Sequence, residues 1–271
     1  MFKTLLFLTF IFTNVVSASE QSKYTSVIVI GHLYPLYDNL GREDKLANLD
    51  VLFNKISKIN NMEKIILLGD TYSEDLDNVY SFVNTEIIPR FKVPILKVLG
   101  NHEVAEIFYK FSRAPVNRGG GRFKLEGGIA KGLFDLNKYR FLIYSPWRFI
   151  DGKPKRVILS DDVKFFERNL NPINNIILVT DALYHPNLSL PKWRKKIEPL
   201  LDSSYVIIGD NDIFQHQYSM ERTENNITYI NQGIASGNLS NRSTILEIRL
   251  FENKEVQFIP HFLKFNKDFR M

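Results

Sequence analysis

Short apolar runs that end in glycine or a polar residue constrain the fold of this chain more than any other feature. The runs are rich in β-branched residues, and helical spacing of apolar residues, as in residues 42–60, separates the first of them. This alternation predicts a layered α/β fold with parallel strand pairing at the centre of a sheet. The runs are "SVIVIGH" (26–32), "KIILLGD" (64–70), "VPILKVLGNHE" (93–103), "NNIILVTD" (174–181) and "SYVIIGD" (204–210).

The rest of the chain predicts a second sheet. The runs joined at "LNKY" (136–139) are typical of a hairpin, and "SDDVKFFERNL" (160–170) predicts a helix with Ser160 as its cap. The tail, residues 227–263, offers three β-rich runs without helices between them, and we expect these to complete the second sheet. With 271 residues and 44% hydrophobic content, residues 19–271 are expected to form one domain.

The first eighteen residues resemble a secretory signal peptide. They contain Lys3, an apolar run from Leu5 to Phe12, and small residues before a cleavage point after Ala18. An uncleaved membrane anchor is the alternative, but the apolar run is short for a membrane span. No later segment predicts a span. The chain is therefore expected to be secreted or periplasmic, and having no cysteine it uses no disulfides there.

The charge of the chain gives little information about its partners. The net charge of +5 comes from dispersed lysines and arginines, with short clusters in "GKPKRV" (152–157) and "PKWRKKIEP" (191–199). Binding to anionic polymers or phosphate compounds is compatible with this charge, although a solvated basic face is the simpler interpretation. Nothing in the sequence specifically indicates nucleic acid.

Polar side chains follow the apolar strands at the points where the strands end. Each of these residues alone is typical of a turn or a helix cap. Ligand sites of open α/β sheets form at the carboxyl ends of the strands, so several such residues together indicate a site. They are His32, Asp70, Asn101, His102, Asp181, Asp210 and Asp212.

The order of these motifs resembles the calcineurin-like metallophosphoesterases. "LLGDTYSED" (67–75) and "VLGNHE" (98–103) resemble the second and third motifs of that family, and "ILVTD" (177–181) and "VIIGDND" (206–212) stand where its last two histidine motifs belong. The resemblance implies a four-layer α/β/β/α sandwich of two packed mixed sheets. It also implies a hydrolase that cleaves phosphate mono- or diesters with a metal-bound water.

The resemblance implies roles for individual residues. Asp70 would be the carboxylate that bridges two metal ions, Asn101 a metal ligand, and His102 the group that stabilises the transition state or protonates the leaving oxygen. The other ligand positions depart from the family pattern, since three imidazoles are replaced by carboxylates, one imidazole by a phenol and one carboxylate by an imidazole. These positions hold His32, Tyr34, Asp181, Asp210 and Asp212.

The altered ligand set favours particular metals. Carboxylate and amide oxygens favour hard cations, so we expect divalent ions, two of them, with Mn, Mg, Ca or Fe favoured over Zn. Tyr34 would bind a metal only if the cation lowered the pKa of its phenol from about 10. Added carboxylates would raise the pKa of bound water, which predicts a slow enzyme with an alkaline optimum.

Two alternatives remain open at this point. A catalytically inactive relative could keep the fold and bind a ligand or partner in the cell envelope or in polysaccharide assembly. A single structural Ca²⁺ site could use the same aspartates. The metal content of the purified protein would separate the two-metal phosphoesterase, the inactive relative and the protein with one structural Ca²⁺. The sequence does not identify a substrate.

Overall fold

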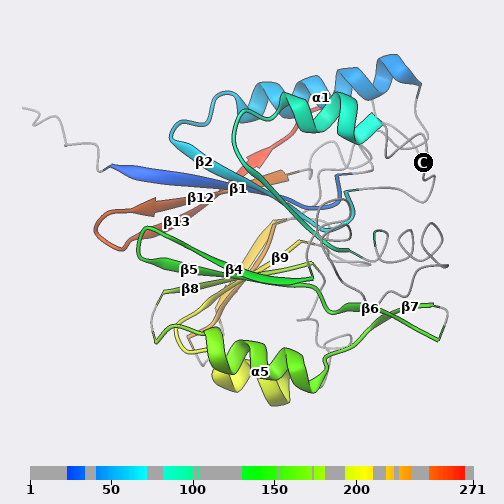
Figure 1. Ribbon diagram of the computed structural model, residues 1–271. Coiled ribbons are helices and arrows are strands. Elements are labelled where there is room, and N and C mark those ends of the chain that lie inside the picture. The colour runs from blue at the N-terminus through cyan, green and yellow to red at the C-terminus, as the bar shows by residue number, and fades with distance from the viewer. Residues whose placement is uncertain are drawn as a thin grey trace, which may run out of the picture.

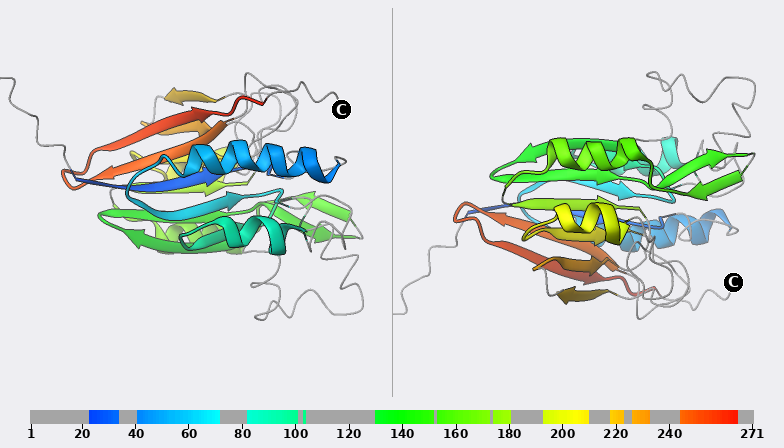
Figure 2. Two further views of the ribbon diagram at one scale, coloured as in Figure 1. Left: turned by 90° about the horizontal axis from the view of Figure 1, so that it is seen from above. Right: turned by 90° about the horizontal axis from the view of Figure 1, so that it is seen from below.

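Two β-sheets lie face to face, with helices on the outer face of each (Figure 1). The views from above and below in Figure 2 show the same layers. The computed structural model describes residues 23–33, 41–71, 82–100, 103, 130–151, 153–172, 174–180, 193–209, 218–222, 226–232 and 244–265.

The first sheet contains five strands in the order β13-β12-β1-β2-β3. Strands β1, β2 and β3 pair in parallel, and β12 and β13 add to the edge of β1 in antiparallel pairing. The strands are β1 (Tyr24–Ile30), β2 (Met62–Leu68), β3 (Ile95–Val98), β12 (Thr244–Phe251) and β13 (Val256–Phe262).

The second sheet contains six strands in the order β10-β11-β9-β8-β5-β4. Its centre, from β11 through β9 and β8 to β5, is parallel, and β10 and β4 are antiparallel edges. A separate hairpin pairs β6 (Trp147–Ile150) with β7 (Lys153–Arg156). The strands of the sheet are β4 (Lys131–Leu136), β5 (Tyr139–Tyr144), β8 (Asn175–Val179), β9 (Tyr205–Ile208), β10 (Ser219–Arg222) and β11 (Thr228–Asn231).

Helix α1 (Arg42–Ile56) covers the outer face of the first sheet (Figure 1). It buries Leu49, Leu52 and Ile56, which lie on one helical face, against the strands. Acidic residues in its first turn and Lys55 in its last turn match the helix dipole. The short helices η2 (Val83–Ile87) and η3 (Ile88–Arg90) extend the same layer.

Helix α5 (Ser160–Asn169) covers the second sheet together with the short helices η4 (Trp193–Ile197) and η5 (Glu198–Leu200) (Figure 1). Phe166 and Trp193 are fully buried between these helices and the sheet. Between the two sheets, alternate residues of β1 and β2 pack on β5 and β8. Three apolar layers therefore separate four layers of secondary structure, which confirms the expected α/β/β/α sandwich.

Two details of the sequence analysis were wrong. Only one of the three tail strands, β11, joins the second sheet, while β12 and β13 return to the first sheet beside β1. Ser160 is not the cap of α5, because the cap position is Leu159, whose backbone N–H donates to Asp162 Oδ2 at 2.8 Å.

The predicted signal peptide, residues 1–18, lies outside the described residues. Within the part of the chain that the structure describes, no helix has both the length and the hydropathy needed to cross a membrane.

Candidate active site

The ends of strands from both sheets meet at one edge of the sandwich. A side chain at Gly31, which follows β1, would overlap the carbonyl oxygen of Gly209, which follows β9. A side chain at Gly209 would in turn overlap the carbonyl oxygen of Leu68 at the end of β2. Gly69 packs directly on the Thr180 side chain, which follows β8. Only glycine permits this close approach, and it brings the carboxyl ends of β1, β2, β8 and β9 together.

His32 and Asp70 form a buried pair at this edge. His32 Nε2 lies 2.6 Å from Asp70 Oδ2, and the residues are only 7% and 1% exposed. Both follow strands that pair in parallel, and the His32 backbone N–H also donates to the Gly69 carbonyl at 3.3 Å. Burial strengthens this charge-assisted contact because little water competes for it.

The backbone at these residues is left-handed. The φ angles of His32 and Asp70 are 48° and 49°, and that of Gly69 is 83°. Residues with a side chain adopt this conformation only at a cost in free energy, and such residues cluster at functional sites. Here the turn directs the chain out of each strand at the point where the two side chains meet.

The other residues predicted for the site lie outside the described residues. These are Tyr34, Asn101, His102, Asp181, Asp210 and Asp212. For Asp181 and Asp210 the residue directly before is described, however, and it reaches the same edge. Thr180 precedes Asp181 and Gly209 precedes Asp210, and both contact the segment that leads into Asp70.

The described pair fits a divalent metal ion as two of its ligands. An imidazole nitrogen and a carboxylate oxygen lie side by side in a buried place, and ligands of these two kinds suit ions such as Mn²⁺ and Fe²⁺. Thr180 Oγ1, buried beside Gly69, has no hydrogen-bond partner within the described part of the chain, so the edge also holds a polar atom available to a further group. Among the described residues no set of three or more His, Asp or Glu side chains is placed to hold a metal.

Glu103, the last residue of "GNHE", has contacts that the sequence analysis did not foresee. It is 1% exposed and accepts hydrogen bonds from the backbone N–H groups of Asp70, Thr71 and Gly100. The acidic residue after Asn-His was visible in the sequence, but its distance from Asp70 along the chain gave no sign of this contact.

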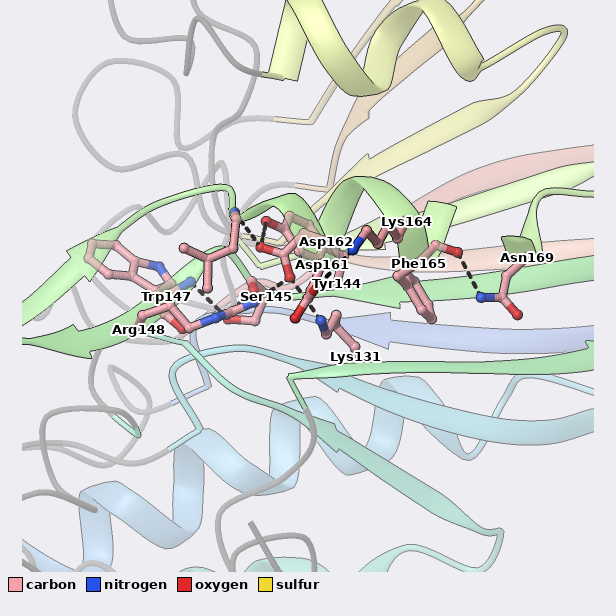
Figure 3. A network of polar contacts seen from close by, with 11 residues as sticks. Lys131, Tyr144, Ser145, Trp147, Arg148, Asp161, Asp162, Lys164, Phe165 and Asn169 are labelled. Carbon is pink, nitrogen blue, oxygen red and sulfur yellow. Dashed lines mark hydrogen bonds and ion pairs between the residues drawn. The ribbon is translucent and has the colours of Figure 1, made fainter. Parts of the chain in front are cut away.

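A second buried carboxylate, Asp162, lies at the start of α5 and was also missed (Figure 3). It accepts hydrogen bonds from the Tyr144 hydroxyl at 3.2 Å and from Arg148 Nη2 at 2.9 Å, and Lys131 Nζ lies 3.0 Å away. Burial and the Asp162 charge raise the pKa of Tyr144, so the phenol stays protonated and donates. This network joins α5 to β4, β5 and the β6–β7 hairpin, which is a structural role.

Comparison with known proteins gives similarities in structure only. No protein-family model and no curated protein matches the sequence. A dimetal phosphatase from Danio rerio superposes with a TM-score of 0.58 at 12% identity, over 87% of this chain and 98% of that one.

Two further solved structures superpose on this chain with lower TM-scores. The NAD nucleotidase of Haemophilus influenzae gives 0.49 at 13% identity, over 89% of this chain and 50% of that one. A phosphatase from Mycoplasma pneumoniae gives 0.45 at 12% identity, over 90% and 95%.

The match to the Danio rerio phosphatase runs through almost the whole of that protein. It also covers 87% of this chain, so the likeness extends over both sheets. The chain therefore has the fold of the calcineurin-like metallophosphoesterases.

Proposed function

We propose that the protein is a metal-dependent phosphoesterase that hydrolyses a phosphate mono- or diester. The observation that carries this proposal is the buried His32–Asp70 pair, 2.6 Å apart, at the edge where strands of both sheets end. Dimetal phosphatases with this fold make divalent metals plausible here. Phosphate esters are accordingly the substrate class that we assign.

Asp70 and His32 would hold the metal in this proposal. Asn101, Asp181, Asp210 and Asp212 would complete the ligand set, with Tyr34 as a further ligand. Bound divalent ions supply an activated water and neutralise charge on the phosphate. His102 would donate a proton to the leaving oxygen or stabilise the transition state.

Export is part of the same proposal. The features of residues 1–18 support a secreted or periplasmic enzyme, whose substrate would be a phosphate compound outside the cytoplasm. The absence of cysteine is compatible with that compartment.

The pair also favours a second candidate function. A hydrogen bond from His32 already satisfies the Asp70 carboxylate, so the edge can be stable with no metal. A catalytically inactive protein of the same fold, binding a ligand or partner in the cell envelope or in polysaccharide assembly, would keep such a pair.

Asp70→Asn separates the two candidates. The parent protein and the variant are assayed with Mn²⁺ on generic phosphomonoester and phosphodiester substrates at neutral and alkaline pH. Asp135→Asn, which changes an exposed carboxylate on β4, is the matched control. The proposal predicts activity in the parent and in Asp135→Asn and a loss of at least about 100-fold in Asp70→Asn. Equal activity in Asp70→Asn would remove Asp70 from the site, and inactivity of all three would favour the binding protein.

A further inference from the structure

We propose that Glu103 is a positioning residue that holds the Asp70 carboxylate in its place at the edge of the sandwich. This proposal rests on the proposed function, in which Asp70 binds metal. In the "GNHE" motif, Asn101 and His102 are candidate site residues. The glutamate that follows them accepts hydrogen bonds from backbone N–H groups beside the site.

One carboxylate joins the ends of two neighbouring strands. Glu103 Oε2 accepts from Asp70 N at 3.0 Å and from Gly100 N at 2.7 Å, and Oε1 accepts from Thr71 N. Asp70 and Thr71 follow β2, and Gly100 follows β3. The Glu103 side chain therefore fixes the relative position of the two strand ends where β2 and β3 stop pairing.

These contacts act on Asp70 from two sides. Its backbone is left-handed, with φ of 49°, a conformation that is strained for a residue with a side chain and persists only when its surroundings hold it. Its side chain lies against Gly100, since a side chain at Gly100 would overlap Asp70 Oδ1. Because Glu103 binds the amides of both residues, it holds the Asp70 backbone and the surface on which the Asp70 carboxylate rests.

Accepting these three backbone hydrogen bonds requires a carboxylate at position 103. A buried carboxylate is stable only with several hydrogen bonds to its charge, and three backbone N–H groups provide them. Glutamine has nearly the same shape, but only one of its two terminal atoms accepts. Its NH₂ group would face a backbone N–H, so at least one of the three amides would lose its acceptor.

Glu103→Gln tests the proposal, with Glu247→Gln as the matched control. Glu247 is also fully buried in the first sheet and accepts hydrogen bonds from Ser26, Arg249 and His261. It lies opposite Ile28, within the sheet, and does not contact the strand ends at Asp70 and Gly100 through any of these bonds. Mn²⁺ binding is measured by calorimetry and by electron paramagnetic resonance. Amide hydrogen exchange of Asp70, Thr71 and Gly100 is measured without metal.

We expect Glu103→Gln to bind Mn²⁺ about 10- to 100-fold more weakly than the parent, as for other residues that orient a metal ligand. The three amides should exchange faster in Glu103→Gln alone. Glu247→Gln should lose thermal stability and keep its Mn²⁺ affinity within about twofold, because it orients no ligand. If Glu103→Gln does not fold, Glu103→Asp replaces it; its carboxylate is one methylene shorter and cannot reach all three amides, so weaker Mn²⁺ binding and faster amide exchange than in the parent are expected.

Folded Glu103→Gln or Glu103→Asp with the parent's Mn²⁺ affinity and the parent's exchange rates would overturn the proposal. A parent protein that binds no Mn²⁺ would instead contradict the proposed function. In that case faster exchange of the three amides in the variant still supports Glu103 as the residue that holds Asp70, and unchanged exchange still overturns it.

Discussion

His32 Nε2 and Asp70 Oδ2 lie 2.6 Å apart at the ends of adjacent parallel strands, both buried. The resemblance places an aspartate at the position of His32. In this chain an imidazole therefore stands beside the carboxylate where relatives would place a second carboxylate, and the pair is stabilised by its own hydrogen bond.

His32→Asp should make the stability of the protein depend on metal. In the variant the hydrogen bond from His32 is lost and two carboxylates repel each other at the buried edge, so we expect it to melt at a lower temperature than the parent without metal. A divalent ion between them would relieve the repulsion, and Mn²⁺ should raise the melting temperature of the variant more than that of the parent. Thermal unfolding with chelator and with Mn²⁺ measures both effects. A variant as stable as the parent in chelator would contradict the close contact.

Gly100→Ala should displace Asp70. The added methyl group would overlap Asp70 Oδ1 and Asp70 N, so we expect a loss of about 1–3 kcal/mol in the free energy of unfolding. Gly41→Ala is the control, because a methyl group there meets nothing within 4 Å. It should cost less than about 1 kcal/mol as a change at the cap of α1. Urea unfolding of the two variants compares them, and equal losses would contradict the close packing at Gly100.

The stability of the protein should fall in acid through Glu247. Burial would raise the pKa of Glu247, but hydrogen bonds from His261, Arg249 and Ser26 outweigh it and lower the pKa from 4.5 to about 2. A pKa lowered by folding adds stability that is fully present above about pH 4.5 and is lost as the pH falls toward 2.

Glu247→Gln removes this titration. Urea unfolding between pH 6 and pH 2 should show a shallower fall in stability for the variant than for the parent. Parallel curves for the two proteins would show that Glu247 has an ordinary pKa.

Asp162→Asn should weaken the network of Figure 3. Its amide nitrogen cannot accept from Arg148 or Tyr144, so we expect a loss of about 1–3 kcal/mol. Asp161→Asn is the control, because that side chain is 78% exposed and its contact with Lys164 spans 3.7 Å. Its cost should be about 0.5 kcal/mol or less. Similar losses in both variants, measured by chemical unfolding, would contradict the assigned network.

The sequence predicted the layers of the fold because apolar periodicity is local. The segments 65–68 and 176–179 are apolar at every position, as expected of strands buried on both faces, and they lie in β2 and β8. The strand ends at His32 and Asp70 could be located for the same reason.

The pairing of the tail strands could not be read in the same way. β12 carries Ile245 toward α1 and Leu246 toward the second sheet, so both of its faces are buried, and the sequence alone does not say beside which strand. The structure places β12 against β1, more than 200 positions earlier in the chain. A long-range choice of this kind depends on which edge is free once the parallel strands have packed.

The contacts of Glu103 and Asp162 were hidden for a related reason. Both residues accept backbone or side-chain hydrogen bonds from segments that folding brings close, such as Glu103 with Asp70. A carboxylate is usually exposed, and only the position of the hydrogen-bond partners shows that these two are buried.

The number of metal ions bound to the purified protein decides whether the strand-end residues form a metal site. Equilibration with Mn²⁺, removal of excess ions and elemental analysis give the equivalents per chain, with Asp70→Asn measured alongside. We predict two equivalents in the parent and a loss of bound metal in Asp70→Asn. No metal in the parent, or one Ca²⁺ with no Mn²⁺, would contradict the account.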